Sequence, residues 1–185
     1  MPKPKLPTRS DLLTYSNRTI PDLIAPGLAV LFCGINPSLY SAYTGHHFAR
    51  PGNRFWPALF GGGFTDRLLS PDQGALLLAQ GIGITNLVSR ATVAADELSD
   101  EELITGGQLL AGKIHIYRPK AVAILGISAF RAAFDLPRSA LGLQPDMLPP
   151  ARIWVLPNPS GLNAHYTPTD LGRIFGEFRQ AINLS

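Results

Sequence analysis

The sequence predicts an α/β protein, a three-layer α/β/α sandwich around a central, mostly parallel four-stranded sheet. Four short apolar runs are bounded by turn residues, a pattern typical of strands buried on both faces. Segments with helical spacing and capping residues separate these runs, and this alternation favours a parallel sheet covered by helices. The predicted strands are residues 28–34, 81–88, 121–126 and 152–157.

Turn and capping signals define the other elements of the N-terminal half. Residues 1–22 are rich in proline and basic side chains, which predicts a flexible arm with a short helix near residues 11–15. A short helix is expected over residues 54–60, because three glycines follow at 61–63. Serine, proline and polar residues at the start of segment 70–80 predict a capped helix there.

The C-terminal half continues the alternation of helices and strands. Ser-Asp-Glu-Glu at the start of segment 99–117 forms a capping-box pattern, which predicts a helix. A second helix is expected at 128–134, and the four prolines of segment 135–150 predict a loop. Thr167 and Pro168 predict the start of the last helix, whose apolar stripe is Leu171, Ile174, Phe175 and Phe178.

Length and composition predict one globular domain, residues 23–185, after the arm. The chain has 185 residues, of which 45% are hydrophobic and 16% charged. Its one cysteine, Cys33, excludes a disulfide framework, a four-cysteine zinc site and an iron–sulfur cluster held by this chain alone. We see neither an apolar run long enough to span a bilayer nor a secretion signal. We therefore expect a cytoplasmic protein, associated with the nucleoid if the source is bacterial.

The distribution of charge is more informative than the net charge of +3. No Asp or Glu occurs in residues 23–65 or in residues 147–169. If these two stretches share a face, that face suits a polyanion such as a phosphate backbone. The alternative is that apolar strands and loops simply contain few charged residues.

Two motifs follow predicted strands and are expected on one rim of the sheet. Gly-Ile-Asn-Pro occupies residues 34–37, and Asn-Pro-Ser-Gly-Leu occupies residues 158–162. Ligands of open α/β sheets bind beyond the carboxyl ends of the strands. Segment 34–56 is predicted to be a long loop with aromatic and basic residues and no acid, which favours a binding element. Asn-Pro is also an ordinary turn dipeptide, so neither motif is decisive alone.

Taken with Phe48 and Asn53-Arg54-Phe55-Trp56, these motifs resemble the mismatch-specific uracil/thymine DNA glycosylases, a branch of the uracil-DNA glycosylase superfamily. The resemblance covers residues 27–182 and includes segments 85–92 and 123–126. It implies a monofunctional DNA glycosylase that flips uracil out of G·U mispairs in double-stranded DNA and hydrolyses the N-glycosidic bond. Thymine, ethenocytosine and other damaged pyrimidines stay open as substrates.

The resemblance also implies partners and cofactors. The enzyme is expected to act in base excision repair as a monomer, without a metal or cofactor, and to pass an abasic site to downstream repair enzymes. No lysine lies in the motifs, so no Schiff base and no strand cleavage are expected.

By resemblance, Asn36 positions the attacking water. A neutral amide orients water but cannot remove its proton, which predicts a slow enzyme. The alternative for Asn36 is a turn or capping residue. Asp96, beyond the second strand, is a second catalytic candidate, and its alternative is a solvated residue before a helix.

The resemblance assigns the base pocket to Ile35, Ser38, Phe48 and Asn158. Phe48 would stack on the base, and backbone amides near Ile35 and Phe48 would contact its edge. Ser38 stands where the family usually has glycine and where enzymes that exclude thymine have a bulky aromatic, so thymine acceptance is open. Asn158 replaces a histidine of the strict uracil enzymes and cannot supply a cation to the departing base.

A wedge is needed because extruding a base leaves a gap in the duplex. The resemblance assigns it to Leu162, flanked by Gly161 and Asn163, and the alternative is that Leu162 packs in the core. Ala164 stands where some members have arginine, so the preference for guanine opposite the target is open. The candidate phosphate contacts are His46, His47, Arg50 and Ser160.

Two rival functions remain at this point. One is a non-catalytic nucleic-acid-binding or nucleotide-binding α/β module in which Asn36 and Asn158 only cap turns. The other is a hydrolase of free nucleosides, which the wedge disfavours because a free nucleoside leaves no gap to fill.

Overall fold

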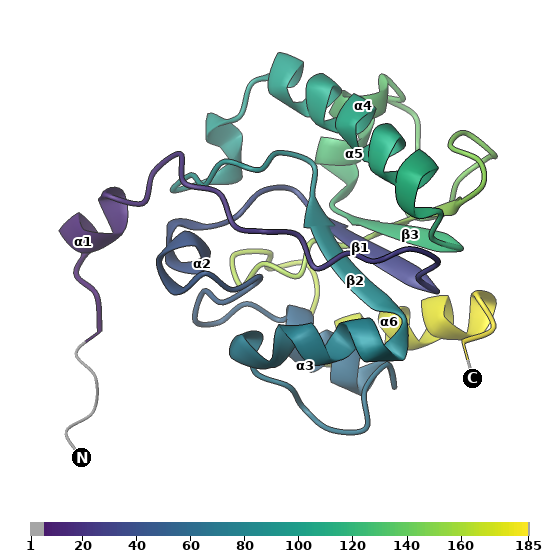
Figure 1. Cartoon of the computed structure of the whole chain (residues 1–185), viewed down its shortest axis with the longest axis horizontal. Helices are drawn as coiled ribbons and strands as arrows, with labels where there is room; N and C mark the ends of the chain where they lie inside the picture. Colours follow the sequence, from purple (N-terminus) through teal and green to yellow (C-terminus); the bar gives the residue numbers. More distant parts are fainter. Residues whose placement is uncertain (1–5, 185) are drawn as a thin grey trace.

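The computed structural model describes residues 6–184, and Lys3 and Lys5 of the expected arm lie outside them. A central sheet runs through this part of the chain in the order β2-β1-β3-β5-β4, and Figure 1 labels β1, β2 and β3. Strands β2, β1, β3 and β5 are parallel, and the edge strand β4 is antiparallel to β5. Their bounds are β1 Val30–Gly34, β2 Ile82–Asn86, β3 Ala121–Leu125, β4 Gly142–Leu143 and β5 Arg152–Leu156.

The predicted α/β fold is confirmed, with one strand more than expected. All four predicted strands are present in the parallel part of the sheet. The additional strand β4 has two residues, which is too short for an apolar period, and it lies in the proline-rich segment 135–150 that was predicted to be a loop.

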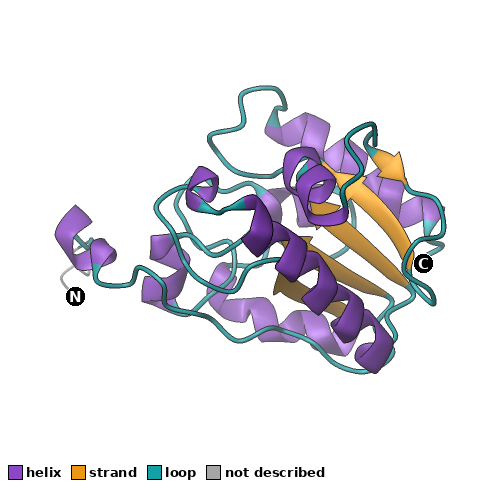
Figure 2. Cartoon of the chain, turned by 90° about the horizontal axis from the view of Figure 1, so that it is seen from above, coloured by secondary structure: helices purple, strands orange, loops and turns teal. Residues whose placement is uncertain are grey.

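Helices cover both faces of the sheet (Figure 2). On one face, α4 (Asp100–Tyr117) and α5 (Ile127–Phe134) pack against Leu31, Cys33, Val122 and Ile124. On the other, α3 (Phe55–Gly61), the 3₁₀ helix η1 (Pro71–Gln80) and α6 (Pro168–Ala181) pack against Val30, Phe32 and Ala123. Alternate strand residues therefore enter two cores, which explains why β1 and β3 are apolar throughout. The shorter helices are α1 (Arg9–Leu13), α2 (Leu39–Thr44) and η2 (Ala95–Glu97).

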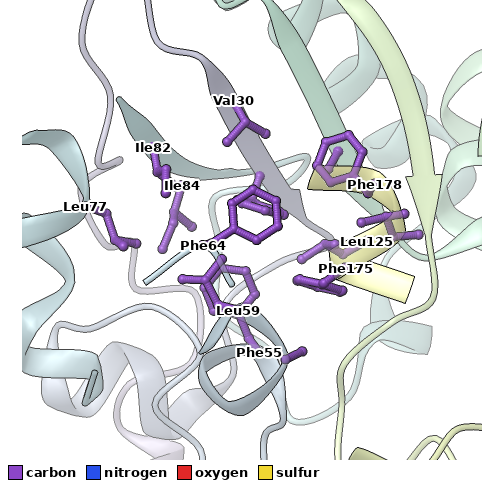
Figure 3. Packing of buried hydrophobic residues seen from close by; sticks show 14 of the residues in the cluster. Val30, Phe55, Leu59, Phe64, Leu77, Ile82, Ile84, Leu125, Phe175 and Phe178 are labelled. Carbon is purple, nitrogen blue, oxygen red and sulfur yellow. The ribbon is translucent and has the colours of Figure 1, made fainter. Parts of the chain in front are cut away.

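Aromatic rings dominate the core between the sheet and α3 and α6 (Figure 3). Phe32 is fully buried and stacks on Phe175 with ring centroids 5.6 Å apart. Its edge-to-face neighbours are Phe55, Phe64 and Phe178. On the opposite face Cys33 is buried as expected, and burial raises the pKa of its thiol far above the usual range, so it is a core residue.

The predicted capping signals form in the structure. The Ser99 hydroxyl accepts from the backbone N–H of Glu102 at 3.2 Å, and the Glu102 carboxylate accepts from the N–H of Ser99 at 3.0 Å. Thr167 and Asp170 form the same reciprocal pair at the start of α6. The cap at Ser70 is also present, although the helix that follows is of the 3₁₀ type.

Segment 34–56 contains a helix, so the prediction of one continuous loop was wrong. Ser38 caps α2 by accepting from the N–H of Ser41 at 3.1 Å, and Gly45 ends it with φ of 74°. Six residues are too few to reveal a helical period, and the sequence around them is rich in turn residues.

The N-terminal segment joins the domain before residue 23. The N–H of Asn17 donates to the carbonyl of Ala91 at 2.9 Å, and Leu23 exchanges backbone hydrogen bonds with Ile84. Ile20 between them is buried. Preceding it, α1 projects from the body beside α2 (Figure 1), where Tyr15 meets Tyr43 edge to face. Across residues 6–184, no helix is both long enough and apolar enough to cross a membrane.

Two glycines of α4 provide a matched test of packing. A Cβ on Gly106 would lie 2.4 Å from the Leu87 carbonyl oxygen, whereas a Cβ on Gly112 would have no neighbour within 4 Å. We expect Gly106→Ala to lower the free energy of unfolding by about 1–3 kcal/mol. Gly112→Ala should raise it by about 0.5–1 kcal/mol, since alanine is the better helix former. Urea denaturation measures both, and equal effects would contradict this packing.

Candidate active site

A cavity of about 420 Å³ opens at the carboxyl ends of the strands. Its wall includes the segments that follow β1 and β5, so the two predicted motifs meet in one place even though more than 100 residues separate them in the sequence. Eleven of the candidate residues line it: Ile35, Asn36, Ser38, His47, Phe48, Arg50, Asp96, Asn158, Ser160, Leu162 and Asn163. His46 and Gly161 lie outside its lining.

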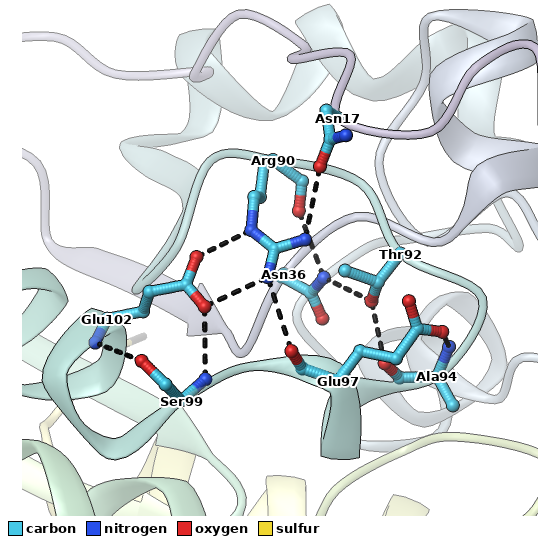
Figure 4. A network of polar contacts seen from close by, with 8 residues as sticks. All are labelled: Asn17, Asn36, Arg90, Thr92, Ala94, Glu97, Ser99 and Glu102. Atoms are coloured by element: carbon cyan, nitrogen blue, oxygen red, sulfur yellow. Dashed lines mark hydrogen bonds and ion pairs between the residues drawn. The ribbon is translucent and has the colours of Figure 1, made fainter.

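The amide of Asn36 is held in one orientation (Figure 4). Its Nδ2 donates to the Arg90 carbonyl at 3.0 Å and to Thr92 Oγ1 at 2.7 Å. The Thr92 hydroxyl donates its one hydrogen to the Ala94 carbonyl at 2.7 Å. Thr92 Oγ1 can therefore only accept the hydrogen bond from Asn36. Because both partners are acceptors, the amide nitrogen must face them. Asn36 Oδ1 is therefore left as an acceptor for a water molecule in the cavity.

An ion pair braces the loop that carries Thr92 (Figure 4). Arg90 donates through Nε and Nη2 to the two oxygens of Glu102 at 2.5 and 2.9 Å. This hydrogen bonding lowers the pKa of Glu102 to about 2, so the carboxylate stays charged at neutral pH. Arg90 also donates to Asn17 Oδ1 at 3.1 Å. The bidentate pair fixes the direction of the loop more firmly than a single contact would.

Asp96 lies in η2 on the cavity wall and is exposed. Among the described residues that line the cavity, it is the only one with a carboxylate. Within residues 6–184, no three His, Cys, Asp or Glu side chains come together as a metal site would require.

An aromatic ring forms part of the cavity wall. Phe48 stacks on Phe55 with ring centroids 4.1 Å apart, and its backbone has φ of 53°, which is uncommon for a bulky residue. Gly34 lies beneath it, because a Cβ there would be 3.2 Å from the ring. The position therefore needs a residue without a side chain, and the cavity side of Phe48 stays open.

His47 does not suit the expected phosphate contact. Its side chain is buried, and its Nε2 makes a 2.9 Å hydrogen bond with the Pro21 carbonyl. Burial lowers the pKa of the ring, which is therefore uncharged at neutral pH. A neutral, buried imidazole offers no cation to a phosphate. Arg50, in contrast, is exposed at the cavity.

The loop after β5 is supported by backbone-directed hydrogen bonds. Asn158 Oδ1 accepts from the N–H of Ser160 at 3.0 Å, and Asn163 Nδ2 donates to the Asn158 carbonyl at 3.0 Å. From α3's N-cap, Arg54 donates to the carbonyls of Asn163 and Gly161 at 3.0 and 3.2 Å and to that of Tyr166. These contacts give the loop a defined shape although it lies outside the sheet.

Leu162 stands at the tip of this loop and is 72% exposed, so the alternative that it packs in the core is wrong. Gly161 next to it permits a close approach, because a Cβ there would lie 2.4 Å from the Gly52 carbonyl oxygen. The structure thus presents an apolar side chain to solvent at the edge of the cavity.

The lining also includes residues that the sequence-based search did not select as candidates, among them Ile20, Asn86 and Thr92. Asn86 ends β2 just as Asn36 follows β1, so its place at the end of a predicted strand was a usable signal. Thr92 belongs to a segment of the resemblance, but no local pattern indicates its hydrogen bond to Asn36. Ile20 gave no signal, because it lies in the segment predicted to be a flexible arm.

Comparison with protein families agrees with this geometry. The model of the uracil DNA glycosylase superfamily matches residues 21–182. The match therefore includes every strand of the sheet and all the candidate site residues.

Proposed function

The chain belongs to the uracil DNA glycosylase superfamily, and we propose that it is a monofunctional, mismatch-specific glycosylase that removes uracil from G·U pairs in double-stranded DNA. Membership implies hydrolytic glycosylase activity on DNA. The specific branch, the mispair and the flipping of the base are our proposal, as are action as a monomer and transfer of the abasic product to later repair enzymes.

One observation supports this function above the others. The oriented amide of Asn36, the ring of Phe48 and the exposed Leu162 all face a single cavity. A nucleoside hydrolase needs a place for water and base but no exposed wedge. A binding module does not need an amide in the cavity wall whose two N–H groups are both held by acceptors, so that only its oxygen is left to interact with water.

The proposed reaction uses these groups in sequence. Leu162 fills the gap left by the extruded base, which lies against Phe48 in the cavity. Asn36 Oδ1 accepts a hydrogen bond from a water molecule and aims its oxygen at the sugar C1′. As the C1′–N1 bond breaks, its electron pair leaves with the base and the sugar acquires oxocarbenium character. The water oxygen then bonds to C1′, and its proton passes to solvent or to the departing base.

Ser38 bears on the choice between uracil and thymine. Its hydroxyl is occupied with α2, since it accepts from the N–H of Ser41 and donates to the Ser41 hydroxyl at 3.0 Å. A serine held in this way leaves more room than a bulky aromatic would, so we propose that a 5-methyl group meets no aromatic obstacle at this position.

The test is cleavage of a labelled duplex that contains one G·U pair, followed by hot alkali. Strand scission at the uracil supports the proposal, and binding without scission supports the binding module. Matched duplexes with G·T and A·U pairs report thymine acceptance and the preference for guanine. Release of base from free uridine alone would identify a nucleoside hydrolase.

Asp96→Asn decides whether a carboxylate assists Asn36. If Asp96 accepts a proton from the water or stabilises the charged sugar, the single-turnover rate should fall about 100-fold, the lower end for such assistance. Asp135→Asn, at the exposed C-cap of α5, is a matched control and should leave the rate unchanged. Full activity of Asp96→Asn would remove Asp96 from the mechanism.

A further inference from the structure

The loop between β5 and α6 that carries Leu162, here called the wedge loop (residues 158–166), lies against the N-terminal end of α3. Arg54, at that end of α3, donates hydrogen bonds to four carbonyls of the loop, those of Pro159, Gly161, Asn163 and Tyr166. Its backbone N–H donates to the first of these at 2.9 Å, and its guanidinium donates to the other three. One residue from a distant part of the sequence therefore holds the wedge loop along most of its length.

The charge of Arg54 is directed at these carbonyls. None of the ion pairs found in residues 6–184 includes Arg54, and no Asp or Glu occurs in residues 23–65 or 147–169. Hydrogen bonds from a charged donor are stronger than those between neutral groups. The planar guanidinium also presents its N–H groups in fixed directions, whereas a lysine ammonium acts as a point charge. Arg54 therefore fixes the positions of several carbonyls at once.

Hydrogen bonds hold both peptide groups that flank Leu162. In the peptide before it, the Gly161 carbonyl accepts from Arg54 Nη2 at 3.2 Å. The N–H of the same peptide, on Leu162, donates to Ser160 Oγ at 3.3 Å. In the peptide after it, the N–H of Asn163 donates to the Ser160 carbonyl at 3.0 Å. Because two planar peptides fix the direction of the Cα–Cβ bond between them, the Leu162 side chain is aimed by the protein itself, and Arg54 is the one of these partners outside the loop.

We propose that Arg54 is a positioning residue for base extrusion: it holds the carbonyls of the wedge loop and thereby aims Leu162 at the gap that the extruded base leaves. The inference rests on the proposed glycosylase function. A loop that became ordered only on the DNA would use part of its binding energy for that ordering, and a prearranged loop does not. Residues 161, 162, 164 and 165 of the loop are exposed, so loss of the guanidinium should change the direction of the loop without unfolding the domain.

The experiment uses the full chain and two substrates, a duplex with one G·U pair and a duplex in which the same uracil lies in an unpaired bubble. Arg54→Met keeps the aliphatic stem of the side chain but removes its charge and all its donors. It should slow single-turnover excision from the G·U duplex about tenfold, the lower end for loss of a hydrogen bond to a charged group. Excision from the bubble should stay within about twofold of the wild-type rate, because no stacked gap has to be filled there.

Three further variants make the test specific. Arg54→Met added to Leu162→Ala should slow excision from the duplex by no more than about a further twofold, since the side chain that Arg54 aims is already gone. Arg54→Lys keeps the charge but holds fewer carbonyls, and should be about threefold slower than wild type on the duplex alone. Arg131 in α5 likewise donates two hydrogen bonds to a loop carbonyl, that of Ser139, at 3.0 and 2.6 Å, but lies outside the cavity lining. Arg131→Met is therefore the matched control and should keep the wild-type rate on both substrates.

The outcomes separate this inference from the proposed function. Equal slowing on duplex and bubble by Arg54→Met, or its full effect again in the Leu162→Ala background, would overturn the inference, as would a wild-type rate beside a duplex-selective loss in Leu162→Ala. Thermal unfolding shows whether Arg54→Met folds. If it does not, Arg54→Lys is compared on the same two substrates, and an unchanged or unselective rate overturns the inference. A wild-type protein that releases uracil from neither substrate would overturn the proposed function itself.

Discussion

Replacing Asn36 with alanine is expected to lower the single-turnover rate of uracil excision from a G·U duplex by about 10²- to 10³-fold, the range for loss of a precisely placed catalytic group. The amide has two separate tasks. Its nitrogen is committed to Arg90 and Thr92, which leaves the oxygen of this cavity-lining residue as the proposed acceptor for water. Alanine removes that acceptor, so the water is no longer directed at C1′.

Binding and folding controls distinguish loss of chemistry from loss of structure. The affinity of Asn36→Ala for the G·U duplex should stay within about threefold of wild type, since phosphate contacts dominate affinity. Asn183→Ala, near the C-terminus and outside the cavity lining, is the matched amide control and should retain the full rate. A rate for Asn36→Ala within about threefold of wild type would show that Asn36 only shapes a turn.

Thr92 extends this reasoning to the orientation of the amide. Thr92→Val keeps the shape of the side chain but removes the oxygen that accepts from Asn36 Nδ2. The bond to the Arg90 carbonyl stays in place, so a partial loss of about tenfold is expected, from one of two orienting hydrogen bonds. A loss as large as that of Asn36→Ala would mean that Thr92 contacts the water itself.

The sheet was predictable because a strand buried on both faces appears in the sequence as a continuous apolar run. Residues such as Phe32 and Cys33 enter opposite cores, so the strand that contains them has no polar positions. Caps such as Ser99 with Glu102 are equally local, since both partners lie within one helical turn. β4 and α2 were missed because two and six residues are too few to show a period.

The site was predictable only for residues that come directly after a predictable strand. Asn36 and Asn158 come just after strands that could be identified, and the geometry of parallel sheets brings such positions to one rim. The environment of His47 could not be foreseen, because it depends on the Pro21 carbonyl, 26 residues away in a segment predicted to be flexible. Its neighbours in the sequence suggested a solvated cation, whereas tertiary packing buries the ring.

Leu162→Ala is expected to slow uracil excision from a G·U duplex by about 10- to 100-fold. Extrusion of a base costs a few kcal/mol, and a side chain that fills the gap recovers part of this cost. Each 1.4 kcal/mol lost changes the rate about tenfold. Leu162 is 72% exposed and has little packing to lose, so the variant should unfold at the wild-type temperature.

The test of the wedge depends on a substrate in which removal of the base leaves no gap in a base stack. When uracil lies in an unpaired bubble, no stacked gap forms, and Leu162→Ala should act within about twofold of the wild-type rate. Leu109→Ala, at a 60% exposed position of α4 that does not line the cavity, should match wild type on both substrates. An equal loss on the duplex and the bubble would instead place Leu162 among the groups that hold the base, because its contribution would then be independent of the DNA stack.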